Sequence, residues 1–266
     1  MLFRSYLRKY PLDSLFAHVA GYQSVIYGST GVESSYEDDL LGKDLDIQLE
    51  NPLGMLKKDE TGDVVLTLEQ RAQEAAKAAL GGRAGTIVVL DVRTGGIVAM
   101  YSEPTYDPNL LATHKADAAR AAFEILNNAP DDRMLPKAYR QIYPPGSTFK
   151  VITTALGLEA GVTDFDMKYP ELKELPLPLS NNTIGNFGGS TCGGTLVEAF
   201  VASCNTVFGQ IGLDLNERFA EGVERFGLNV GAPPLDLKPG AVESIGPKRG
   251  SFKAEAPRSE EHTSEL

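Results

Sequence analysis

The chain is organised around one stretch, Tyr-Pro-Pro-Gly-Ser-Thr-Phe-Lys at residues 143–150. Its Pro-Pro-Gly turn stops the preceding segment, because proline cannot continue a helix and has no backbone N–H. From Ser147 a helical pattern runs to Ala160, and Gly161 follows as the residue that ends it. The pattern is apolar on nearly every face, so we expect this helix to be buried.

Ser147 and Lys150 stand at i and i+3 in the first turn of this helix, where such side chains are neighbours. A lysine in a dry pocket can be neutral and take the proton of a serine hydroxyl, which makes the serine a nucleophile. The helix N-terminus adds partial positive charge where an oxyanion would form. Ser-x-x-Lys alone is weak evidence, because most such lysines are solvated surface charges. Its place at the opening of an apolar helix favours catalysis, since burying an idle lysine is costly.

Composition limits the classes of function. The chain has 266 residues, 42% of them hydrophobic, which is enough for one large or two modest domains with real cores. Its net charge of -11 argues against nucleic acid as a partner. With three histidines and two cysteines, a zinc site or a Ser-His-Asp triad has little to be built from. The sequence has no run of 18 apolar residues and no signal-peptide core at its start, so it predicts no membrane-spanning helix.

Two strand-like runs, 86–91 and 97–101, flank a turn at 93–96 and predict a hairpin. Their continuous rather than alternating apolarity predicts strands covered on both faces, which requires helices on either side of the sheet. The helix of residues 147–160 is the natural cover for one face. The predicted fold class is therefore α/β (α+β), with an antiparallel sheet covered by helices on both faces.

Two capping-box patterns predict helix starts. A strand at 63–66 is followed by Thr-Leu-Glu-Gln at 67–70, which should open an Ala-rich helix that ends before Gly81. The second pattern, Thr-Leu-Val-Glu at 195–198, should start a short helix that runs through Ala202.

That short helix ends at Ser203-Cys204-Asn205, and an apolar helical pattern resumes over 206–213. A junction of two helices can aim the serine and the asparagine into one cleft. Asparagine offers a donor and an acceptor to a substrate amide, and a hydroxyl can relay a proton. Ser180-Asn181-Asn182 has the same Ser-x-Asn form, but it lies in a Pro-rich loop where turn formation explains it. We therefore favour the copy at Ser203.

These motifs resemble those of the penicillin-binding transpeptidases, the serine acyltransferases of peptidoglycan synthesis. The resemblance rests on Pro-Pro-Gly-Ser-Thr-Phe-Lys at 144–150, Gly-Thr-Leu at 194–196 and Ser-Cys-Asn at 203–205. The predicted hairpin, with the segment 102–109 after it, is also similar to the part that the family places ahead of its nucleophile. The start of the chain, around 10–22, looks like the end of the pedestal domain of class B members, especially the A-type protein of high-GC Gram-positive bacteria.

The resemblance implies the penicillin-binding/serine β-lactamase-like transpeptidase fold, incomplete at the C-terminus. Residues 1–62 are expected to be the remnant of an N-terminal pedestal (non-penicillin-binding) domain, and residues 63–257 a truncated transpeptidase domain. Residues 258–266 resemble the translation of a common sequencing adapter and are expected to be an artefact.

One departure from the family pattern matters. The third motif, Lys-Thr-Gly or Lys-Ser-Gly on an edge strand, is absent, and the nearest strings at 238–240 and 248–250 are expected to be loop residues. In the family this motif comes well downstream of the second, so we expect a fragment that lacks both the motif and the membrane anchor. Half of the oxyanion hole would then be missing, and the fragment itself is expected to be inactive. The complete protein would be anchored in the cell membrane, with this part on the extracytoplasmic face.

The resemblance also implies the chemistry. Lys150 takes the proton of Ser147, which attacks the D-Ala-D-Ala carbonyl of a stem peptide. Ser203 relays the proton to the departing D-alanine, Asn205 holds the peptide amide, and an amine of a neighbouring stem resolves the acyl-enzyme into a crosslink. No metal or organic cofactor is needed. Expected partners are peptidoglycan stem peptides and β-lactam antibiotics, with divisome or elongasome membrane proteins as further candidates and no nucleic acid.

Two other classes of function stay open. A serine β-lactamase or β-lactam sensor would share Ser147 and Lys150, but a class A hydrolase also needs a carboxylate base past the second motif. A non-catalytic module could use the same fold to bind a partner. The release of a bound fluorescent penicillin separates hydrolase from transpeptidase, because it is rapid in the first and slow in the second.

Cys192 and Cys204 flank the predicted short helix, and we expect them not to be joined. A helix rises about 1.5 Å per residue, which separates the ends of 195–202 by roughly 12 Å. A disulfide needs α-carbons about 4.4 to 6.8 Å apart. Unless the glycine loop before the helix folds back along it, the sulfurs cannot meet, and Cys204 would be a small packing residue turned away from the cleft.

Overall fold

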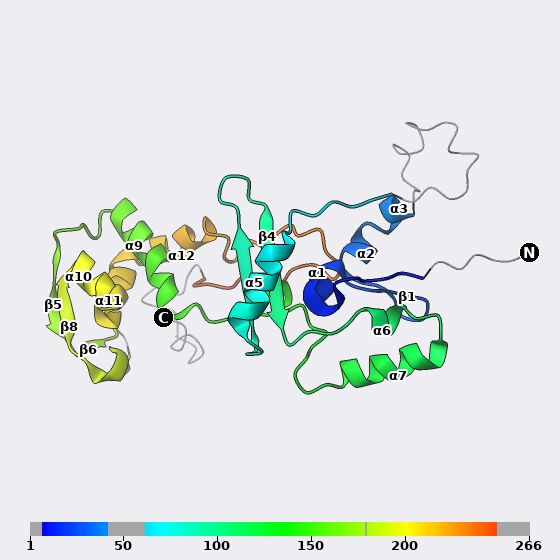
Figure 1. The fold of residues 1–266 in the computed structure, drawn as a ribbon. Coiled ribbons are helices and arrows are strands. Elements are labelled where there is room, and N and C mark those ends of the chain that lie inside the picture. Colours follow the sequence, from blue (N-terminus) through cyan, green and yellow to red (C-terminus); the bar gives the residue numbers. More distant parts are fainter. Residues whose placement is uncertain (1–6, 42–61, 179, 249–266) are drawn as a thin grey trace, which may run out of the picture. The chain divides into compact units, whose positions relative to one another are not determined.

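The chain forms two compact units that contain helices and antiparallel strand pairs (Figure 1), which confirms the predicted α/β class. The first unit comprises the residues up to Gln141 and a return segment, Pro234–Val242. The second comprises Ile142–Pro233 and the residues from Glu243 onwards. The structure is a computed structural model, and it describes residues 7–41, 62–178 and 180–248.

An antiparallel hairpin forms the centre of the first unit. Strand β3 (Gly85–Leu90) pairs with β4 (Ile97–Glu103), as the two apolar runs predict. Most of β4 is buried, whereas Val88, Val89 and Leu90 of β3 are 41%, 42% and 55% exposed. The cover that continuous apolarity predicts is therefore uneven, close on β4 and partial on β3.

Helix α5 (Gln70–Leu80) lies across this hairpin and packs on β4 (Figure 1). Its buried Gln73 accepts a hydrogen bond from the amide of Met100 (2.6 Å) and donates to the carbonyls of Leu15 (3.0 Å) and Met100 (3.2 Å). A buried amide is stable only when its polar atoms are paired, so these contacts fix the position of the side chain. Gln73 thus joins α5, β4 and the N-terminal segment into one core.

The remaining elements of the first unit are mostly short. The longest of them is the helix α7 (Ala116–Asn127). Apolar side chains of these elements pack with the hairpin in clusters around Met100 and Tyr101, and with one another in a cluster around Tyr106. The elements are η1 (Asp13–Phe16), α1 (Ala17–Ala20), β1 (Gln23–Ser24), β2 (Gly28–Ser29), α2 (Gly31–Ser35), α3 (Glu37–Leu40), α6 (Asn109–Ala112), α7 (Ala116–Asn127) and α8 (Lys137–Arg140).

Two predictions for the segment before α5 are wrong. Residues 63–66 do not form a strand in the described structure, although Val64 packs against the cluster around Met100. Thr67 does not cap the helix, because its hydroxyl donates to the carbonyl of Ile97 (2.7 Å) and Glu69 is the N-cap residue. Contacts with the hairpin therefore override both local patterns.

The return segment contains one of the two strings that come nearest to the family's third motif. Lys238–Gly240 lies outside the helices and strands, with a single bridge from Lys238 to Gly31, in agreement with the loop that the sequence predicts. The other string extends past residue 248, and the adapter-like segment 258–266 also lies outside the described residues.

The second unit is built around α11 (Asn205–Leu215). This helix packs against α9 (Lys150–Glu159), α12 (Glu217–Glu224) and three strands, β6 (Glu174–Pro176), β7 (Thr183–Gly185) and β8 (Cys192–Thr195). Buried side chains of α11, such as Ile211, join those of α9 and α12 in one core. The other elements are η3 (Gly146–Phe149), β5 (Lys168–Leu172), η4 (Phe187–Gly189) and α10 (Leu196–Val201). Among the described residues, no helix of either unit combines the length and apolar character that crossing a membrane requires.

Helix α9 is buried on one face only. Leu156 and Gly157 face the core, and a Cβ on Gly157 would lie 2.8 Å from a side-chain carbon of Ile211. Val151 on the other face is 58% exposed. The prediction that the whole helix is buried is wrong for the described structure, because α11 and α12 cover just one side of it. Gly161 follows the helix with φ of 66°, as expected of the residue that ends it.

Helix α10 starts with the capping box that the sequence predicts. The hydroxyl of Thr195 accepts a hydrogen bond from the amide of Glu198 (3.3 Å), and the carboxylate of Glu198 accepts one from the amide of Thr195 (2.7 Å). Both ends of the reciprocal motif are therefore present.

Candidate active site

The first motif lies where η3 continues into α9. Gly146 has φ of 56°, in the left-handed region that glycine adopts without strain, and the chain turns there into the helix. Ser147 lies in η3 and Lys150 is the first residue of α9. The predicted contact between them is present, with Nζ of Lys150 3.3 Å from Oγ of Ser147.

The second motif lies at the junction of α10 and α11. Ser203 has φ of 54°, a left-handed conformation that is uncommon for a residue with a side chain. The chain reverses there, and the amide of Cys204 donates to the carbonyl of Ala199 (2.9 Å) in the last turn of α10. Asn205 then opens α11. The reversal turns the side chains of Ser203 and Asn205 toward the same lysine.

The four predicted site residues meet around the terminal nitrogen of Lys150. Nζ lies 2.6 Å from the carbonyl oxygen of Ser203, 2.9 Å from its Oγ and 2.6 Å from Oδ1 of Asn205. The hydroxyl oxygens of Ser203 and Ser147 are 2.9 Å apart. Ser180 instead accepts a hydrogen bond from the amide two residues later (3.0 Å), as turn formation predicts.

The contacts of Lys150 leave a defined place for a proton. A carbonyl oxygen can only accept, so the Ser203 carbonyl and the Asn205 side-chain oxygen take two N–H groups of the lysine. A neutral amine has two N–H groups and one lone pair, which is then left for a hydroxyl. Burial lowers the pKa of Lys150, because a charged group loses hydration there. The site is therefore suited to hold this lysine as a base.

Cys192 and Cys204 are joined in a disulfide, so the prediction that they are not is wrong. Their α-carbons are 5.8 Å apart. Because these α-carbons are so close, the glycine segment before α10 must run back beside the helix. A Cβ on Gly193 would lie 2.4 Å from the carbonyl oxygen of Pro170 in β5, so only glycine fits there. With the reversal at Ser203, this brings the two cysteines together. Cys204 is fully buried, as a packing residue should be.

Two residues that the sequence analysis did not single out complete the site. The carbonyl of Gly185, at the end of β7, accepts a hydrogen bond from Nδ2 of Asn205 (3.0 Å). The next residue, Asn186, is buried, and its Oδ1 accepts from the amide of Thr206 (3.1 Å). These contacts join residues 20 apart in the chain, so no helical or strand period marks them. The one available signal was an asparagine within a glycine-rich loop.

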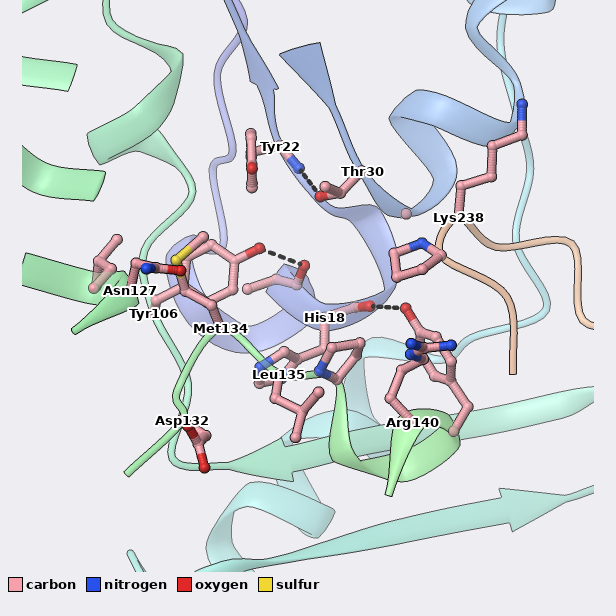
Figure 2. Close-up of a pocket in the computed structure, with 16 residues that line it drawn as sticks. His18, Tyr22, Thr30, Tyr106, Asn127, Asp132, Met134, Leu135, Arg140 and Lys238 are labelled. Atoms are coloured by element: carbon pink, nitrogen blue, oxygen red, sulfur yellow. Dashed lines mark hydrogen bonds between the residues drawn. The ribbon is translucent and has the colours of Figure 1, made fainter. Parts of the chain in front are cut away.

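A separate cavity of about 350 Å³ lies in the first unit and is lined mainly by apolar and aromatic side chains (Figure 2). Its buried polar groups are paired with its own walls. The hydroxyl of Tyr139 donates to the carbonyl of His18 (3.2 Å), and that of Thr30 accepts from the amide of Tyr22 (3.3 Å). Burial lowers the pKa of His18, whose Nε2 contacts the carbonyl of Arg133 (2.9 Å), as expected of a structural histidine. In the described ranges no three His, Cys, Asp or Glu side chains gather as metal ligands would.

Two sequence families match the chain. Residues 85–250 match the penicillin binding protein transpeptidase domain, and residues 3–65 match the penicillin binding protein A dimerisation domain. The first match includes Lys150 and the three site residues around it, and it covers more than half of the chain.

Named relatives share much of the sequence. The chain is 39% identical to the peptidoglycan D,D-transpeptidase PbpA of Mycolicibacterium smegmatis, over 91% of the chain and 51% of the relative. It is 36% identical to PbpA of Mycobacterium tuberculosis, with the same coverage of 91% and 51%. The chain thus spans about half the length of these relatives. Their names confirm the resemblance to the A-type protein.

Solved structures show the same fold. The penicillin G acyl-enzyme complex of penicillin-binding protein A from M. tuberculosis aligns with a TM-score of 0.85 and 34% identity, covering 92% of this chain and 59% of that one. The imipenem acyl-enzyme complex of that protein aligns with a TM-score of 0.83 over 91% of this chain and 58% of that one, also at 34% identity. These matches confirm the predicted transpeptidase fold. Together with the match over residues 85–250, they establish that this chain belongs to the penicillin-binding protein transpeptidase family.

Proposed function

We propose that the chain is part of a serine D,D-transpeptidase that crosslinks peptidoglycan stem peptides through an acyl-enzyme on Ser147. The observation that carries the proposal is the contact network of Lys150, which reaches Ser147, Ser203 and Asn205 within 3.3 Å. Relatives named D,D-transpeptidases and the acyl-enzyme complexes of the M. tuberculosis protein support the same chemistry.

In the proposed reaction Ser147 loses its proton and its Oγ bonds to the carbonyl carbon of the D-Ala-D-Ala peptide. Two proton paths are open, a direct step of 3.3 Å to Lys150 and a path of two 2.9 Å steps through the hydroxyl of Ser203. When the carbon–nitrogen bond breaks, the same proton returns through Ser203 to the departing D-alanine. The amine of a second stem peptide then attacks the ester, restores Ser147 and forms the crosslink.

Asn205 is proposed to hold the substrate amide. Its Oδ1 is taken by Lys150, while Nδ2 donates one of its two hydrogens to the carbonyl of Gly185. The second hydrogen remains for a substrate carbonyl. Asn205 can therefore bind substrate without releasing Lys150.

We place the complete protein on the extracytoplasmic side of the cell membrane, where peptidoglycan and β-lactams are found, with a membrane anchor. The match of residues 3–65 to a dimerisation domain supports residues 1–62 as the remnant of an N-terminal pedestal domain, with residues 63–257 as the transpeptidase part. A Lys-Thr-Gly or Lys-Ser-Gly motif is expected in the complete protein beyond the second motif. Divisome or elongasome membrane proteins are the proposed partners.

A serine β-lactamase or β-lactam sensor would use the same Ser147 and Lys150. The names of the relatives favour the transpeptidase, and the rate of deacylation separates the two classes. A transpeptidase retains a bound fluorescent penicillin for long periods, whereas a β-lactamase releases it rapidly.

The test is to expose a full-length protein carrying this sequence to penicillin and locate the adduct by mass spectrometry. We expect the adduct on the peptide that contains Ser147, and none in the Ser147→Ala variant. An adduct on Ser203 or Ser180, with Ser147 unmodified, would refute the assignment.

A further inference from the structure

The start of α11 determines where Asn205 points, because Asn205 is the first residue of that helix. The first amides of a helix lack partners within it and need an acceptor from outside. Cys204, the N-cap residue, supplies none, since its side chain makes no cap and its sulfur is in the disulfide. The amide of Thr206 instead donates to Oδ1 of Asn186 (3.1 Å). A residue from another part of the chain thus caps α11.

The other end of the Asn186 side chain is anchored as well. Its Nδ2 donates to the carbonyls of Leu172 (2.8 Å) and Ser190 (3.0 Å), with a longer contact to Lys173 (3.4 Å). Since only the NH₂ group can face these carbonyls, the amide has one orientation, with Oδ1 toward α11. Oδ1 also lies 3.8 Å from the sulfur of Cys204, but a disulfide sulfur has no proton to donate. Asn186 is 8% exposed, so water competes little for these hydrogen bonds.

Asn186 also influences the hydrogen bond between the side-chain amide of Asn205 and the carbonyl of Gly185. The neighbouring residue, Gly185, accepts through its carbonyl from Nδ2 of Asn205 (3.0 Å), and Oδ1 of Asn205 accepts from Lys150 (2.6 Å). Asn205 is therefore held through its backbone by the helix that Asn186 caps and through its side chain by the loop that Asn186 anchors. Loss of Asn186 would loosen both supports.

We propose that Asn186 is a positioning residue that acts through Asn205, keeping the amide of Asn205 directed at Lys150 and at the substrate. The proposal rests on the proposed transpeptidase function of the site. Asn186 itself does not touch the reacting atoms. Its side chain contacts backbone groups at 172, 173, 190 and 206 and the sulfur of Cys204.

The test is a double-mutant cycle on acylation by a fluorescent penicillin, in a full-length protein carrying this sequence. We expect Asn186→Ala to slow acylation about 10- to 100-fold, as the loss of buried hydrogen bonds does. If Asn186 acts through Asn205, the Asn186→Ala/Asn205→Ala double variant is no slower than Asn205→Ala alone, within about threefold. Two effects that multiply in full would show that Asn186 acts by another route and would overturn the proposal.

The pH dependence of acylation provides a second readout. Asn186→Ala and Asn205→Ala should shift the pH midpoint of acylation in the same direction, because both change the contact between Asn205 and Lys150. The matched control is Tyr169→Phe, which removes another buried hydrogen bond of the same unit, from Tyr169 to Thr163 (2.7 Å). It should lower stability without moving the midpoint. A shift of equal size in Tyr169→Phe would mean that the effect is general loosening of the fold.

Two further variants keep the result interpretable. If Asn186→Ala does not fold, the cycle is repeated with Asn186→Asp, which keeps the shape and the acceptor for Thr206 but loses the NH₂ donors. Ser147→Ala should abolish labelling in every background. Labelling of Ser147→Ala would refute the proposed nucleophile, whereas a failed cycle with intact Ser147 dependence would refute only the role of Asn186.

Discussion

Lys150 is the residue whose surroundings decide the chemistry of the site. Four oxygen atoms lie between 2.6 and 3.3 Å from its Nζ, and two of them are carbonyl oxygens. An ammonium group has three N–H groups for these four acceptors. A neutral amine satisfies both carbonyl oxygens and still offers a lone pair to the hydroxyl of Ser147 or Ser203. Burial lowers the pKa of Lys150 and so shifts it toward this second state.

Replacing Lys150 with arginine keeps the charge but removes the base, because a guanidinium does not give up its proton in a protein. We expect penicillin acylation of Lys150→Arg to fall by about 100-fold or more while folding is retained. Lys168→Arg, an exposed lysine on β5 of the same unit, is the matched control and should acylate normally.

In the unmodified protein the acylation rate should rise with pH as Lys150 loses its proton. The midpoint should lie below the usual lysine value of 10.5, because burial lowers the pKa of this group. Stopped-flow measurement of acylation across pH gives both the rate and its pH midpoint. Near-normal acylation of Lys150→Arg, or a rate that does not change with pH, would mean that another group activates the serine.

Local sequence was enough to predict the contact within the first motif and the shared direction of the side chains in the second, and the resemblance to the family implied that the two motifs meet. The spacing of Ser147 and Lys150 is one helical turn, and Ser203 and Asn205 lie at a junction that the flanking helical patterns reveal. Gly185 and Asn186 could not be found in this way, because their contacts with α11 exist only after β7 packs against that helix. The path of the chain between the two motifs depends on how its strands and helices pack, which local patterns do not show.

Among the elements, the two capping-box patterns have different outcomes for a physical reason. At Thr195 the hydroxyl and the Glu198 carboxylate accept hydrogen bonds from each other's backbone amides. At Thr67 the carbonyl of Ile97 in β4 takes the hydroxyl (2.7 Å). A capping pattern predicts a helix start only where no neighbouring strand offers a better partner.

This difference can be measured. Thr195→Ala should lower the free energy of unfolding by about 1 kcal/mol, the usual effect of losing a cap. Thr67→Ala, the matched control at the failed pattern, should lower it by about 0.5 kcal/mol or less. Urea unfolding at neutral pH checks both values. Equal losses at the two positions would contradict the capping assignment.

The effect of Thr195→Ala should also depend on pH. The pKa of Glu198 lies below its usual 4.5, mainly because its carboxylate accepts a hydrogen bond from the amide of Thr195. A hydrogen bond from the Thr195 hydroxyl is the second cause. A carboxylate with a depressed pKa contributes stability above the unfolded value, and this is lost as pH falls through the folded value. The difference between Thr195→Ala and the unmodified chain should therefore shrink in acid.

The disulfide shows where reasoning from single elements fails. The length of α10 alone separates its ends too far for a bridge, and that arithmetic is sound for a straight path. The path is not straight, because Gly193 allows close approach to β5 and Ser203 reverses the chain. In particular, the residue type of Ser203 does not predict its positive φ, because residues with a side chain rarely adopt one.

For the whole molecule, the described residues on either side of the predicted boundary at 62 share their cores. The hydroxyl of Tyr139 donates to the carbonyl of His18, and Gln73 donates to that of Leu15. Apolar side chains from the two sides pack together in three clusters, namely Leu15 with Tyr101, Val19 and Val32 with Met100, and Ala17 and Tyr22 with Tyr106 and Leu111. The sequence divides the chain by composition and resemblance, which do not reveal whether two segments bury each other's surface.

We therefore predict that residues 63–257, taken without residues 1–62, do not fold stably. Deletion exposes the apolar surface of Tyr101, Tyr106 and Leu111, each now at most 6% exposed, and leaves the NH₂ group of Gln73 without the carbonyl of Leu15. Truncating a single buried side chain costs about 2 to 5 kcal/mol, so losing several at once exceeds much of the stability of a domain. Hydrophobic dye binding should rise and cooperative thermal unfolding should be lost when 1–62 is removed from a full-length protein carrying this sequence. The control supplies residues 1–62 as a separate chain, which should reduce dye binding again if the shared cores are the cause. A truncated protein that unfolds cooperatively and binds no more dye than the original would show that the transpeptidase part folds independently of the segment before it.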